Sequence, residues 1–469
     1  MKTSTSKRLR WNVAIWLAAG LFMTSASGMA AGPIMPDPKA EARHQPQVEE
    51  TANGIPLVNI TAPSSGGVSR NEYETFNVPD KGAILNNSYT LSKTELAGYV
   101  QGNNNMAERP AKIIVNEVTG AGSTSMDGFL EVAGNRADVV IANPNGITVN
   151  GGGFINTGKA FLTTGKPVYD GEDHLQRFDI TGGDILIEGK GLGGKEAGSL
   201  AILSRAVKIN AGIWAKDLHI TTGANTVKAK TIEASAIEGK GGHPAFALDT
   251  AAIGGMYAGR ITLVGTEKGL GVNNSGTWSA EDNLILDWNG DLKNSGTIYS
   301  KGNTDLRASR LENDKTIAAE RNLSAAAKEN IRNQGKLLAG ENMDIYAGKT
   351  LDNAGHAMES GNNLSIETGD AINNAAGTIK SGGSQQIKAG HTLTNTEGTL
   401  AADGNINIQT DKMTGDGIVS AGKKAGILLE KDFTNTGRLE AGSKPFTSRK
   451  RKYNQPQRDP FPRTPGTGK

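Results

Sequence analysis

The sequence contains no cysteine, few aromatic residues and almost no net charge. With no cysteine among 469 residues, disulfides, catalytic thiolates and thiolate metal ligands are excluded. A net charge of +2 gives the whole chain no long-range attraction to nucleic acid or membranes, so no nucleic-acid partner is expected. Aromatic residues make up 5% and glycines number 62, a composition that favours thin, repetitive β structure over a compact α/β enzyme.

Long apolar runs are also missing, except at the N-terminus. Positive residues between positions 2 and 10 precede an apolar run at 11–23, which is too short to span a bilayer comfortably. Small residues follow, with cleavage expected in the region of Gly28, Ala30 and Ala31. Residues 1–31 are therefore predicted to be a signal peptide for the Sec translocon, the alternative being an uncleaved anchor.

The sequence shows none of the patterns that carry common enzyme chemistry. Its six histidines are scattered without an i, i+4 pair, which disfavours a zinc site. Residues 189–194 match G-x-G-x-x-G, but a dinucleotide site needs a helix to open there, and the sequence that follows is β-like. We therefore expect no catalytic residue, no cofactor and no metal ion.

A repeat of about 20 residues fills the second half of the chain. Nine units lie between residues 272 and 442, with Asn-x-Gly-like turns 19 to 22 residues apart. One unit cannot bury its own apolar face, whereas stacked units form a continuous core. Small apolar residues suit the interior of a right-handed parallel β-helix, and the turn asparagines should stack into ladders. A leucine-rich repeat has a similar period, but its signature is missing.

Changes in pattern divide the chain into five segments. After the signal peptide, the proline-rich residues 32–54 are expected to form a flexible leader. Short β-branched runs between Gly/Asn turns predict an all-β domain at 55–265, with short helices only near 92–99 and 197–205. The repeat forms a shaft at 266–442. Residues 443–469, basic and rich in proline, are expected to be a disordered tail, and a shaft without a cap suggests a truncated chain.

The turn Asn143-Pro144-Asn145-Gly146 lies between two β-branched runs. Asparagine at the first position can bond its own backbone, proline presets φ at the second, and Asn-Gly tolerates left-handed conformations. The local chemistry therefore predicts a strand–turn–strand unit, which any all-β protein can use.

The surroundings of this turn resemble the secretion domain of two-partner secretion exoproteins, the filamentous-haemagglutinin-like family. The matching segments are residues 53–56 (NGIP), 67–73 (GVSRNEY), 76–78 (FNV), 82–88 (GAILNNS), 115–120 (VNEVTG), 137–147 (ADVVIANPNGI), 153–157 (GFINT), 211–215 (AGIWA) and 254–259 (GGMYAG). The chain departs from the family at two places. The second family motif, Asn-Pro-Asn-Leu, falls on Asn103-Asn104-Asn105-Met106, and Val149 and Gly152 stand where some members carry a cysteine pair.

The resemblance implies a non-enzymatic exoprotein that is secreted or displayed at the cell surface, by way of the periplasm and the outer membrane. Its partner would be an outer-membrane two-partner secretion transporter, a β-barrel with periplasmic domains, which recognises the secretion domain. The secretion motif would comprise Asn143 to Gly146 and, in the second turn, Asn103, Asn105 and Met106. The structural alternative is that these residues only close tight turns.

Three other functions stay open at this stage. A β-helical polysaccharide lyase or hydrolase shares the scaffold but needs clustered charged residues on one face of the shaft. An autotransporter passenger needs a C-terminal membrane barrel. The chain can also be the stem of a contact-dependent growth inhibition toxin rather than an adhesin, and its ligand, on a host or a sibling cell, is not named by the sequence.

Overall fold

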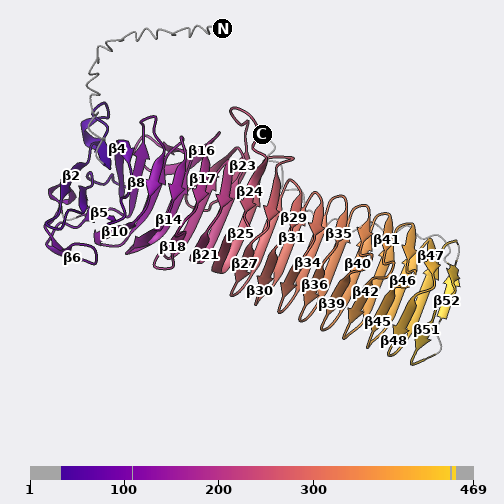
Figure 1. Ribbon diagram of the computed structural model, residues 1–469. Helices are drawn as coiled ribbons and strands as arrows, with labels where there is room; N and C mark the ends of the chain where they lie inside the picture. The colour runs from indigo at the N-terminus through magenta and orange to yellow at the C-terminus, as the bar shows by residue number, and fades with distance from the viewer. Residues whose placement is uncertain (1–32, 108, 432, 444–445, 450–469) are drawn as a thin grey trace, which may run out of the picture.

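The chain folds into one long parallel β-helix, built almost entirely from strands (Figure 1). The computed structural model describes residues 33–107, 109–431, 433–443 and 446–449. The predicted signal peptide and most of the predicted tail lie outside these residues. Among the described residues, no helix is long and apolar enough to cross a membrane. We call residues 33–265 the head and residues 266–449 the shaft.

Each coil of the shaft contributes three strands to the helix. In one coil these are β29 (Leu292–Asn294), β30 (Thr297–Ser300) and β31 (Thr304–Ala308). Each strand pairs in parallel with its counterpart one coil later, as β30 does with β33 (Thr316–Ala319). The spacing between paired strands is roughly 4.8 Å, so the coils stack at that repeat. The predicted parallel β-helix is confirmed.

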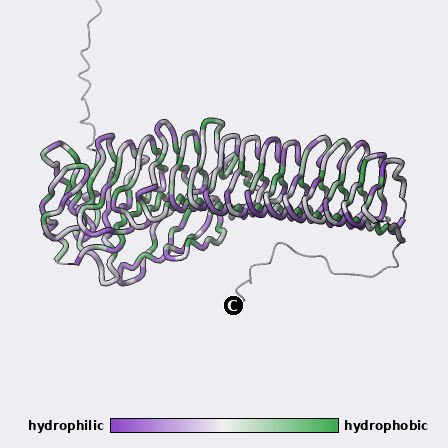
Figure 2. The backbone as a smooth tube through the Cα atoms, turned by 90° about the horizontal axis from the view of Figure 1, so that it is seen from below, coloured by the Kyte–Doolittle hydropathy of each residue, from purple (hydrophilic) through white to green (hydrophobic). Residues whose placement is uncertain are grey.

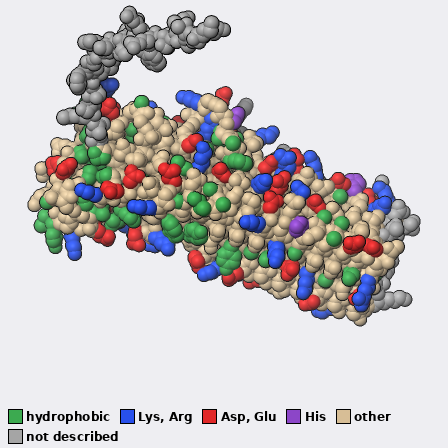
Figure 3. All heavy atoms as spheres, viewed as in Figure 1, with side chains coloured by type: hydrophobic (Ala, Val, Ile, Leu, Met, Phe, Trp, Pro, Cys, Tyr) green, Lys and Arg blue, Asp and Glu red, His purple; other side chains and the backbone are tan. Residues whose placement is uncertain are grey.

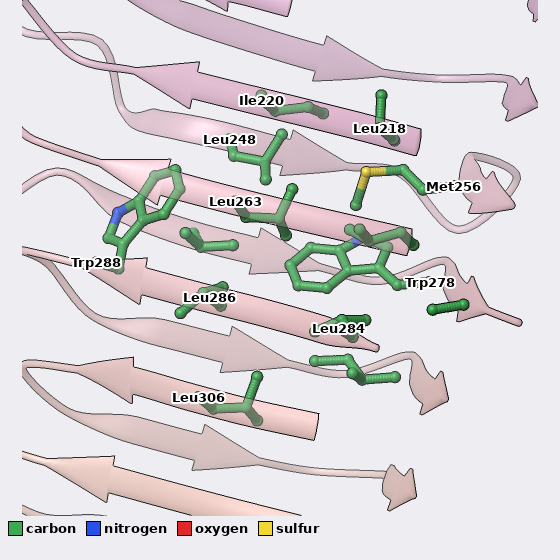
Figure 4. Close-up of a cluster of buried hydrophobic side chains, with 14 of the residues drawn as sticks. Leu218, Ile220, Leu248, Met256, Leu263, Trp278, Leu284, Leu286, Trp288 and Leu306 are labelled. Atoms are coloured by element: carbon green, nitrogen blue, oxygen red, sulfur yellow. The ribbon is translucent and has the colours of Figure 1, made fainter. Parts of the chain in front are cut away.

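The core lies inside the coils because side chains alternate along every strand. In β28 (Leu284–Trp288), for example, Leu284, Leu286 and Trp288 are buried, while Ile285 and Asp287 between them are exposed. Figure 4 shows such inward side chains stacked from coil to coil at the junction of head and shaft. Its labelled residues are Leu218, Ile220, Leu248, Met256, Leu263, Trp278, Leu284, Leu286, Trp288 and Leu306.

The predicted asparagine ladder is confirmed in the shaft. Seven buried turn asparagines form it. The side-chain N–H of each of the first six donates to the Oδ1 of the asparagine one coil later over 2.7 to 2.9 Å, and the seventh donates to the carbonyl of Ile418. The seven are Asn274, Asn294, Asn313, Asn333, Asn353, Asn374 and Asn395. Each bond satisfies amide groups that would otherwise be buried without partners.

The head carries strands outside the β-helix, which Figure 2 shows as extra loops of chain beside the coils. A four-stranded antiparallel sheet consists of β15 (Lys166–Tyr169), β16 (Leu175–Ile180), β22 (Asn225–Lys228) and β23 (Ala234–Ala236). Its buried Phe178, Ile180 and Val227 pack on outward apolar residues of the helix such as Val140 and Phe161. Without this cover, that face of the head would be apolar and exposed.

The two predicted short helices are wrong. Residues 92–99 form most of a hairpin of β6 (Ser92–Thr94) and β7 (Gly98–Val100), because a turn at 95–97 reverses the chain after only three residues. Residues 197–205 contain β19 (Ser199–Ser204), which pairs on both sides within the helix. Pairing with neighbouring coils therefore overrides the local helical tendency of these segments.

The flexible leader expected at 32–54 is also wrong for its described residues. Strand β1 (Ile34–Pro36) pairs antiparallel with β4 (Val68–Phe76), and β2 (Gln47–Glu50) pairs antiparallel with β3 (Pro56–Asn59). These strands cover the open edge of the first coil, which would otherwise expose unpaired backbone groups. The leader is therefore an N-terminal cap, held by the pairing of β1 with β4 and of β2 with β3 rather than by its own composition.

The shaft continues into the segment expected to be a disordered tail. Strand β51 (Leu439–Ala441) pairs with β48 (Ile418–Ala421), and β52 (Phe446–Arg449) pairs in parallel with β49 (Ala425–Leu429). The edge of the last coil supplies unpaired backbone groups for β52, so pairing extends past residue 442 although the sequence period has ended there.

Candidate recognition turns in the head

The Asn143–Gly146 turn connects β11 (Ala137–Ala142) to β12 (Ile147–Val149). The Asn143 side chain is fully buried, and its Oδ1 accepts the backbone N–H of Asn145 over 2.9 Å. Its Nδ2 donates to the carbonyl of Gly122 over 2.9 Å and to the hydroxyl of Thr124 over 3.0 Å. The first asparagine therefore ties its own turn to the preceding coil.

The other residues of this turn are also held by neighbouring coils. Asn145 donates from Nδ2 to the carbonyl of Gly120 over 2.8 Å, although the residue itself is exposed. Gly146 has a φ of 113°, which disfavours any side chain there, and its carbonyl accepts the N–H of Thr124 over 3.0 Å. The next coil approaches so closely that a Cβ on Gly183 would lie 2.7 Å from the carbonyl oxygen of Pro144.

The Asn103–Met106 turn has the same hydrogen-bond pattern despite its different sequence. Oδ1 of Asn103 accepts the N–H of Asn105 over 3.0 Å, as Oδ1 of Asn143 accepts that of Asn145. In each turn the fourth residue donates its N–H to the carbonyl of the first over 3.1 Å. The 3₁₀ helix η2 (Asn104–Met106) forms part of this turn.

The second turn is likewise tied to the coil that precedes it. Asn103 donates from Nδ2 to the carbonyls of Ile60 and Asn86, each over 2.9 Å, and Asn105 donates to Ile60 over 3.1 Å. Met106 is 1% exposed and lies in the core, where the family motif has leucine. The departure from Asn-Pro-Asn-Leu therefore keeps both the turn and its apolar anchor.

Few atoms of these turns remain available to a partner once the chain has folded. Asn103 and Asn143 are buried, and their amide groups are fully used by the protein. Only Asn104, Pro144 and Asn145 are exposed. A partner that reads the buried asparagines must therefore meet the chain before the head folds.

A cleft of charged residues beside the second turn was not anticipated from the sequence. Arg43, His44, Arg70 and Asp173 line it together with Asn105. Its members come from the cap, from β4 and from the loop between β15 and β16, so no spacing in the sequence signals the cluster. The cleft joins three elements that pack at the N-terminal end of the head.

The ionisable groups of this cluster are extensively paired. Arg70 bonds Glu72 over 2.8 Å, and Arg43 bonds Asp173 over 2.7 Å. His44 Nδ1 lies 3.0 Å from Glu72 Oε1, but burial and the nearby positive charge of Arg70 lower the pKa of His44. We infer that the neutral imidazole donates its Nδ1–H to Glu72.

Two neighbouring groups, Glu117 and Tyr169, have raised pKa values. Burial raises the pKa of Glu117, although Arg70 partly offsets the effect. Burial also raises the pKa of Tyr169, whose ring lies under the Arg70 guanidinium at 4.4 Å from the ring centroid. Both groups contact Arg70, which links elements at the N-terminal end of the head.

The G-x-G-x-x-G segment forms a turn between strands. Gly189 and Gly191 have φ values of 55° and 79°, and β18 (Leu192–Gly194) follows them directly. A dinucleotide site needs a helix at that point, so the segment does not fit one. In the described part of the chain, no group of three or more His, Asp or Glu residues is placed to hold a metal ion.

The fold and the two turns define a β-helical protein whose first coils carry a specialised head, and comparison with known proteins gives the family. The family model of the TPS secretion domain matches residues 33–299. The model of the haemagglutinin repeat matches residues 289–357, 344–409 and 396–444. The chain therefore belongs to the two-partner secretion family, with haemagglutinin repeats behind the secretion domain.

Curated relatives are similar over about two thirds of the chain. Toxin CdiA of Yersinia pestis is 41% identical over 311 residues, which cover 61% of this chain and 9% of that protein. The 16S rRNA endonuclease CdiA of Enterobacter cloacae is 40% identical over 314 residues, which cover 66% of this chain and 9% of that protein. The chain thus spans about a tenth of the length of these relatives.

A solved structure supports the fold. The crystal structure of the filamentous haemagglutinin secretion domain superposes with a TM-score of 0.50 at 23% identity, covering 89% of this chain and 99% of that one. Membership of the family means that the chain is an exoprotein of the two-partner pathway, secreted or displayed at the cell surface. It also means that an outer-membrane transporter recognises the head.

Proposed function

We propose that the head is an export signal read in the periplasm and that the shaft is a rigid, non-enzymatic spacer that holds the rest of the protein away from the cell. The Sec translocon would deliver the chain to the periplasm. A transporter barrel with periplasmic domains would then bind the head, and the chain would cross the pore extended. The observation that carries this proposal is the match of residues 33–299 to the secretion domain.

The two turns support a role in recognition before folding or in the first step of folding. Asn143 and Asn103 each close a turn and at the same time bond the preceding coil, at Gly122 and Ile60 respectively. A turn of this kind can form only when its predecessor is in place. In the extended chain the side chains of these asparagines are available to a partner. As each coil closes they form bonds within the protein, which favours folding in the direction of export.

The shaft fits a spacer because its coils repeat the same contacts. Nine coils extend roughly 43 Å at a spacing of about 4.8 Å. Ion pairs link successive coils at the surface, including Lys301–Glu281, Arg310–Asp291 and Lys349–Glu329. Figure 3 shows positive and negative side chains mixed along the shaft, where a polysaccharide-cleaving enzyme would gather them into a site.

One surface column of the shaft illustrates this mixing. From one coil to the next, corresponding positions hold acidic and basic or imidazole side chains in alternation. The residues are Glu329, Lys349, Asp370, His391, Asp411 and Lys431. Alternation pairs each carboxylate with a neighbour, which supports register between coils rather than catalysis.

A second candidate function is the stem of a contact-dependent growth inhibition toxin. It is favoured by the two relatives named as a toxin and an endonuclease, which resemble this chain over only 9% of their own length. In both candidates the head and shaft have the same task, and a ligand on a host or sibling cell would be bound elsewhere in the protein. The toxin-stem function differs from the adhesin function only in the region that the shaft would display.

Secretion by cells that express the transporter tests the proposal. The full chain is co-expressed with its transporter, and secreted and periplasmic protein are measured for wild type and for Asn143→Ala with Asn145→Ala. We expect the double variant to accumulate in the periplasm. Asn333→Ala with Asn353→Ala, which removes two amides of the shaft ladder, is the matched control and should be exported. Undiminished secretion of the first variant would refute the role of the turn.

A further inference from the structure

A second cleft of the head is lined by positive side chains and lies beside the cleft around His44. It has a volume of about 680 Å³, within the range of roughly 300 to 1,000 Å³ that is typical of small-molecule sites. Its walls are the residues that precede or begin β4, β8 (Ile113–Val118), β11 and β14 (Thr157–Thr163), which pair in parallel in that order on neighbouring coils. The two clefts share Pro63 and Ser64 but no ionisable residue.

Three cations line this cleft without an acidic partner among the described residues. Arg109, Lys112 and Arg136 are all exposed, and no ion pair in the described part of the chain includes any of them. Because Asp138 pairs with Ile113, Arg136 and Lys112 lie at nearly the same level on neighbouring coils. Like charges on neighbouring strands repel each other, whereas the surface column of the shaft alternates in sign. The head therefore holds an excess of positive charge here, which a bound anion would neutralise.

The folded coils hold two of these cations in place. The N–H of Lys112 donates to the carbonyl of Gly67 over 2.8 Å. The stem of Lys112 also lies against Gly67, where an added Cβ would be 3.1 Å from the lysine Cγ. Arg136 donates from Nη2 to the carbonyl of Thr157 over 2.7 Å. A site with charged groups that are already positioned loses less conformational entropy when a ligand binds.

The acidic residue of the described lining, Asp138, does not cancel this charge. Its Oδ1 accepts the backbone N–H of Lys159 over 2.7 Å, so one oxygen of the carboxylate is used to hold the start of β14. The positive charges of Lys159 and Arg136 also act on this carboxylate. The cleft therefore keeps a net positive charge, and a hollow lined mainly by one sign of charge concentrates the field that attracts an anion.

The other residues of the lining indicate which anion fits. Guanidinium groups bind phosphate through two parallel N–H···O bonds, and a phosphate monoester carries a charge of about −1.5 to −2 at neutral pH. The cations lie on two coils, roughly 4.8 Å apart, so they can meet more than one phosphate group. The described lining contains no aromatic side chain on which a nucleobase could stack. Ser65 and Asn135 instead supply a hydroxyl and an amide, which suit the hydroxyls of a sugar.

We propose that this cleft binds a saccharide that carries phosphate monoesters. Arg109, Lys112 and Arg136 bind the phosphate groups, and Ser65 and Asn135 bind hydroxyls of the sugar. The site exists only when several coils have folded, so it acts after export and does not involve the transporter. The inference therefore goes beyond the proposed function, in which the head is an export signal.

Binding to the purified, folded full chain tests this inference. Isothermal titration calorimetry compares four probes: a glucosamine disaccharide with two phosphate monoesters, the same disaccharide without phosphate, its sulfated counterpart, and inorganic phosphate. The site variant carries Arg109→Gln, Lys112→Gln and Arg136→Gln. A second variant, Arg109→Gln with Lys112→Gln, keeps the bond between Arg136 and Thr157. The control removes the same charge from exposed shaft positions and carries Lys293→Gln, Lys315→Gln and Lys336→Gln.

We expect wild type and the control to bind the bisphosphorylated disaccharide alike, and both site variants to bind it about tenfold more weakly or worse, with unchanged melting temperatures. Higher salt should weaken the binding, and inorganic phosphate should bind less tightly than the disaccharide. Absence of binding by wild type, equal binding by the site variants and the control, or equal binding of the disaccharide without phosphate would overturn the site. Equal binding of inorganic phosphate would overturn the saccharide, and tighter binding of the sulfated counterpart would overturn the choice of phosphate.

Discussion

The head and the shaft bury asparagine in two different ways. In the shaft, buried asparagines bond one another from coil to coil, so each position is a copy of the one before. In the head, each buried asparagine has partners of its own. Asn87, for example, bonds the backbone of Ala111 and Asn135, and Asn116 bonds the hydroxyl of Tyr73 and the carbonyl of Val140.

This difference implies that the shaft tolerates the substitution of one buried asparagine better than the head does. A ladder amide that loses one neighbour still has a second acceptor nearby, as Asn313 does in the carbonyl of Lys336. A head amide that is lost leaves buried groups with no substitute. Selection for an export signal would act on such single-copy contacts, whereas a spacer needs only that most of its coils are intact.

The largest effect is expected from a charge in the interior of the shaft. Leu364 in β40 (Leu364–Thr368) is 1% exposed, so Leu364→Asp places a carboxylate in the core at a cost of several kcal/mol. The next coil already holds a buried polar residue, Gln385, but its amide donates to the carbonyls of Ile379 and Ala401. An ionised aspartate has no N–H to donate in this way.

Limited proteolysis with mass mapping checks this prediction. Cleavage should appear from the altered coil toward the C-terminus, because later coils lose the edge on which they pair. Gln386→Asp is the control, since Gln386 is exposed on the same sheet and its paired neighbours, Ser365 and Asn407, are uncharged. Unchanged cleavage of the Leu364 variant would mean that a single coil is dispensable even for folding.

A smaller but more direct test compares one asparagine from each region. Asn143→Ala removes the acceptor of the Asn145 N–H and the donor to the Thr124 hydroxyl, and it leaves the carbonyl of Gly122 with only a long bond from Asn145. We expect it to cost about 2 kcal/mol or more. Asn333→Ala removes bonds to Asn353, to the carbonyl of Ala357 and from the N–H of Gly335. Its ladder neighbours Asn313 and Asn353 keep their bonds to the carbonyls of Lys336 and His356, so we expect a smaller cost, about 1 kcal/mol. Denaturant unfolding of both variants measures the difference. Equal losses would show that ladder and single-copy asparagines are equivalent.

The third prediction concerns acid stability of the head. Because the pKa of His44 is lowered in the folded protein, the unfolded chain binds its proton more readily, and stability is lost as pH falls below about 6.5. Glu72 and Asp173 partly offset this shift, but burial of the ring and the positive charges of Arg70 and Arg43 outweigh them. His44→Gln should remove this part of the pH dependence.

Thermal melts between neutral and mildly acidic pH separate the head from the shaft. His391→Gln is the matched control, since His391 is an exposed shaft residue that pairs with Asp370 at the surface. We expect the control to keep the wild-type profile. An unchanged profile for His44→Gln would mean that the cap is held by strand pairing alone and that the charged cleft adds nothing to it.

The sequence predicted the shaft well because every signal there is repeated. The period, the inward Leu and Ile positions and the ladder asparagines appear in coil after coil, so a single irregular coil does not obscure them. The Asn143–Gly146 turn was also predicted, since its residues bond locally. Its ties to Gly120 and Thr124 could not be predicted, because they depend on which coil lies next to which.

The head was predicted less completely because its features occur once. The cap strands contain few apolar residues, and Ile34 alone enters the main core from β1. Strand β1 pairs with residues more than 30 positions away, whereas β2 pairs with β3 only 6 to 12 positions away. The strands of the hairpin at 92–100 pair with each other, but Glu131 and Asn53 from distant segments hold its turn. The cluster around His44 likewise joins segments that are far apart in the sequence, which a local pattern does not record.

The smallest effect is expected at the C-terminal edge, where the repeat pattern and the structure disagree. Removing residues 450–469 leaves every described strand in place, so the melting temperature of the shaft should not change. Removing residues 444–469 also deletes β52 and exposes the edge of β49, with Ile427 and Leu429 beneath it. That shorter chain should have a slightly lower melting temperature and should self-associate more, because an open edge pairs with other chains.

Circular dichroism melts and analytical ultracentrifugation compare the two deletions. Identical behaviour would mean that β52 adds no stability, and that the cooperative shaft ends with its last repeat rather than with its last paired strand.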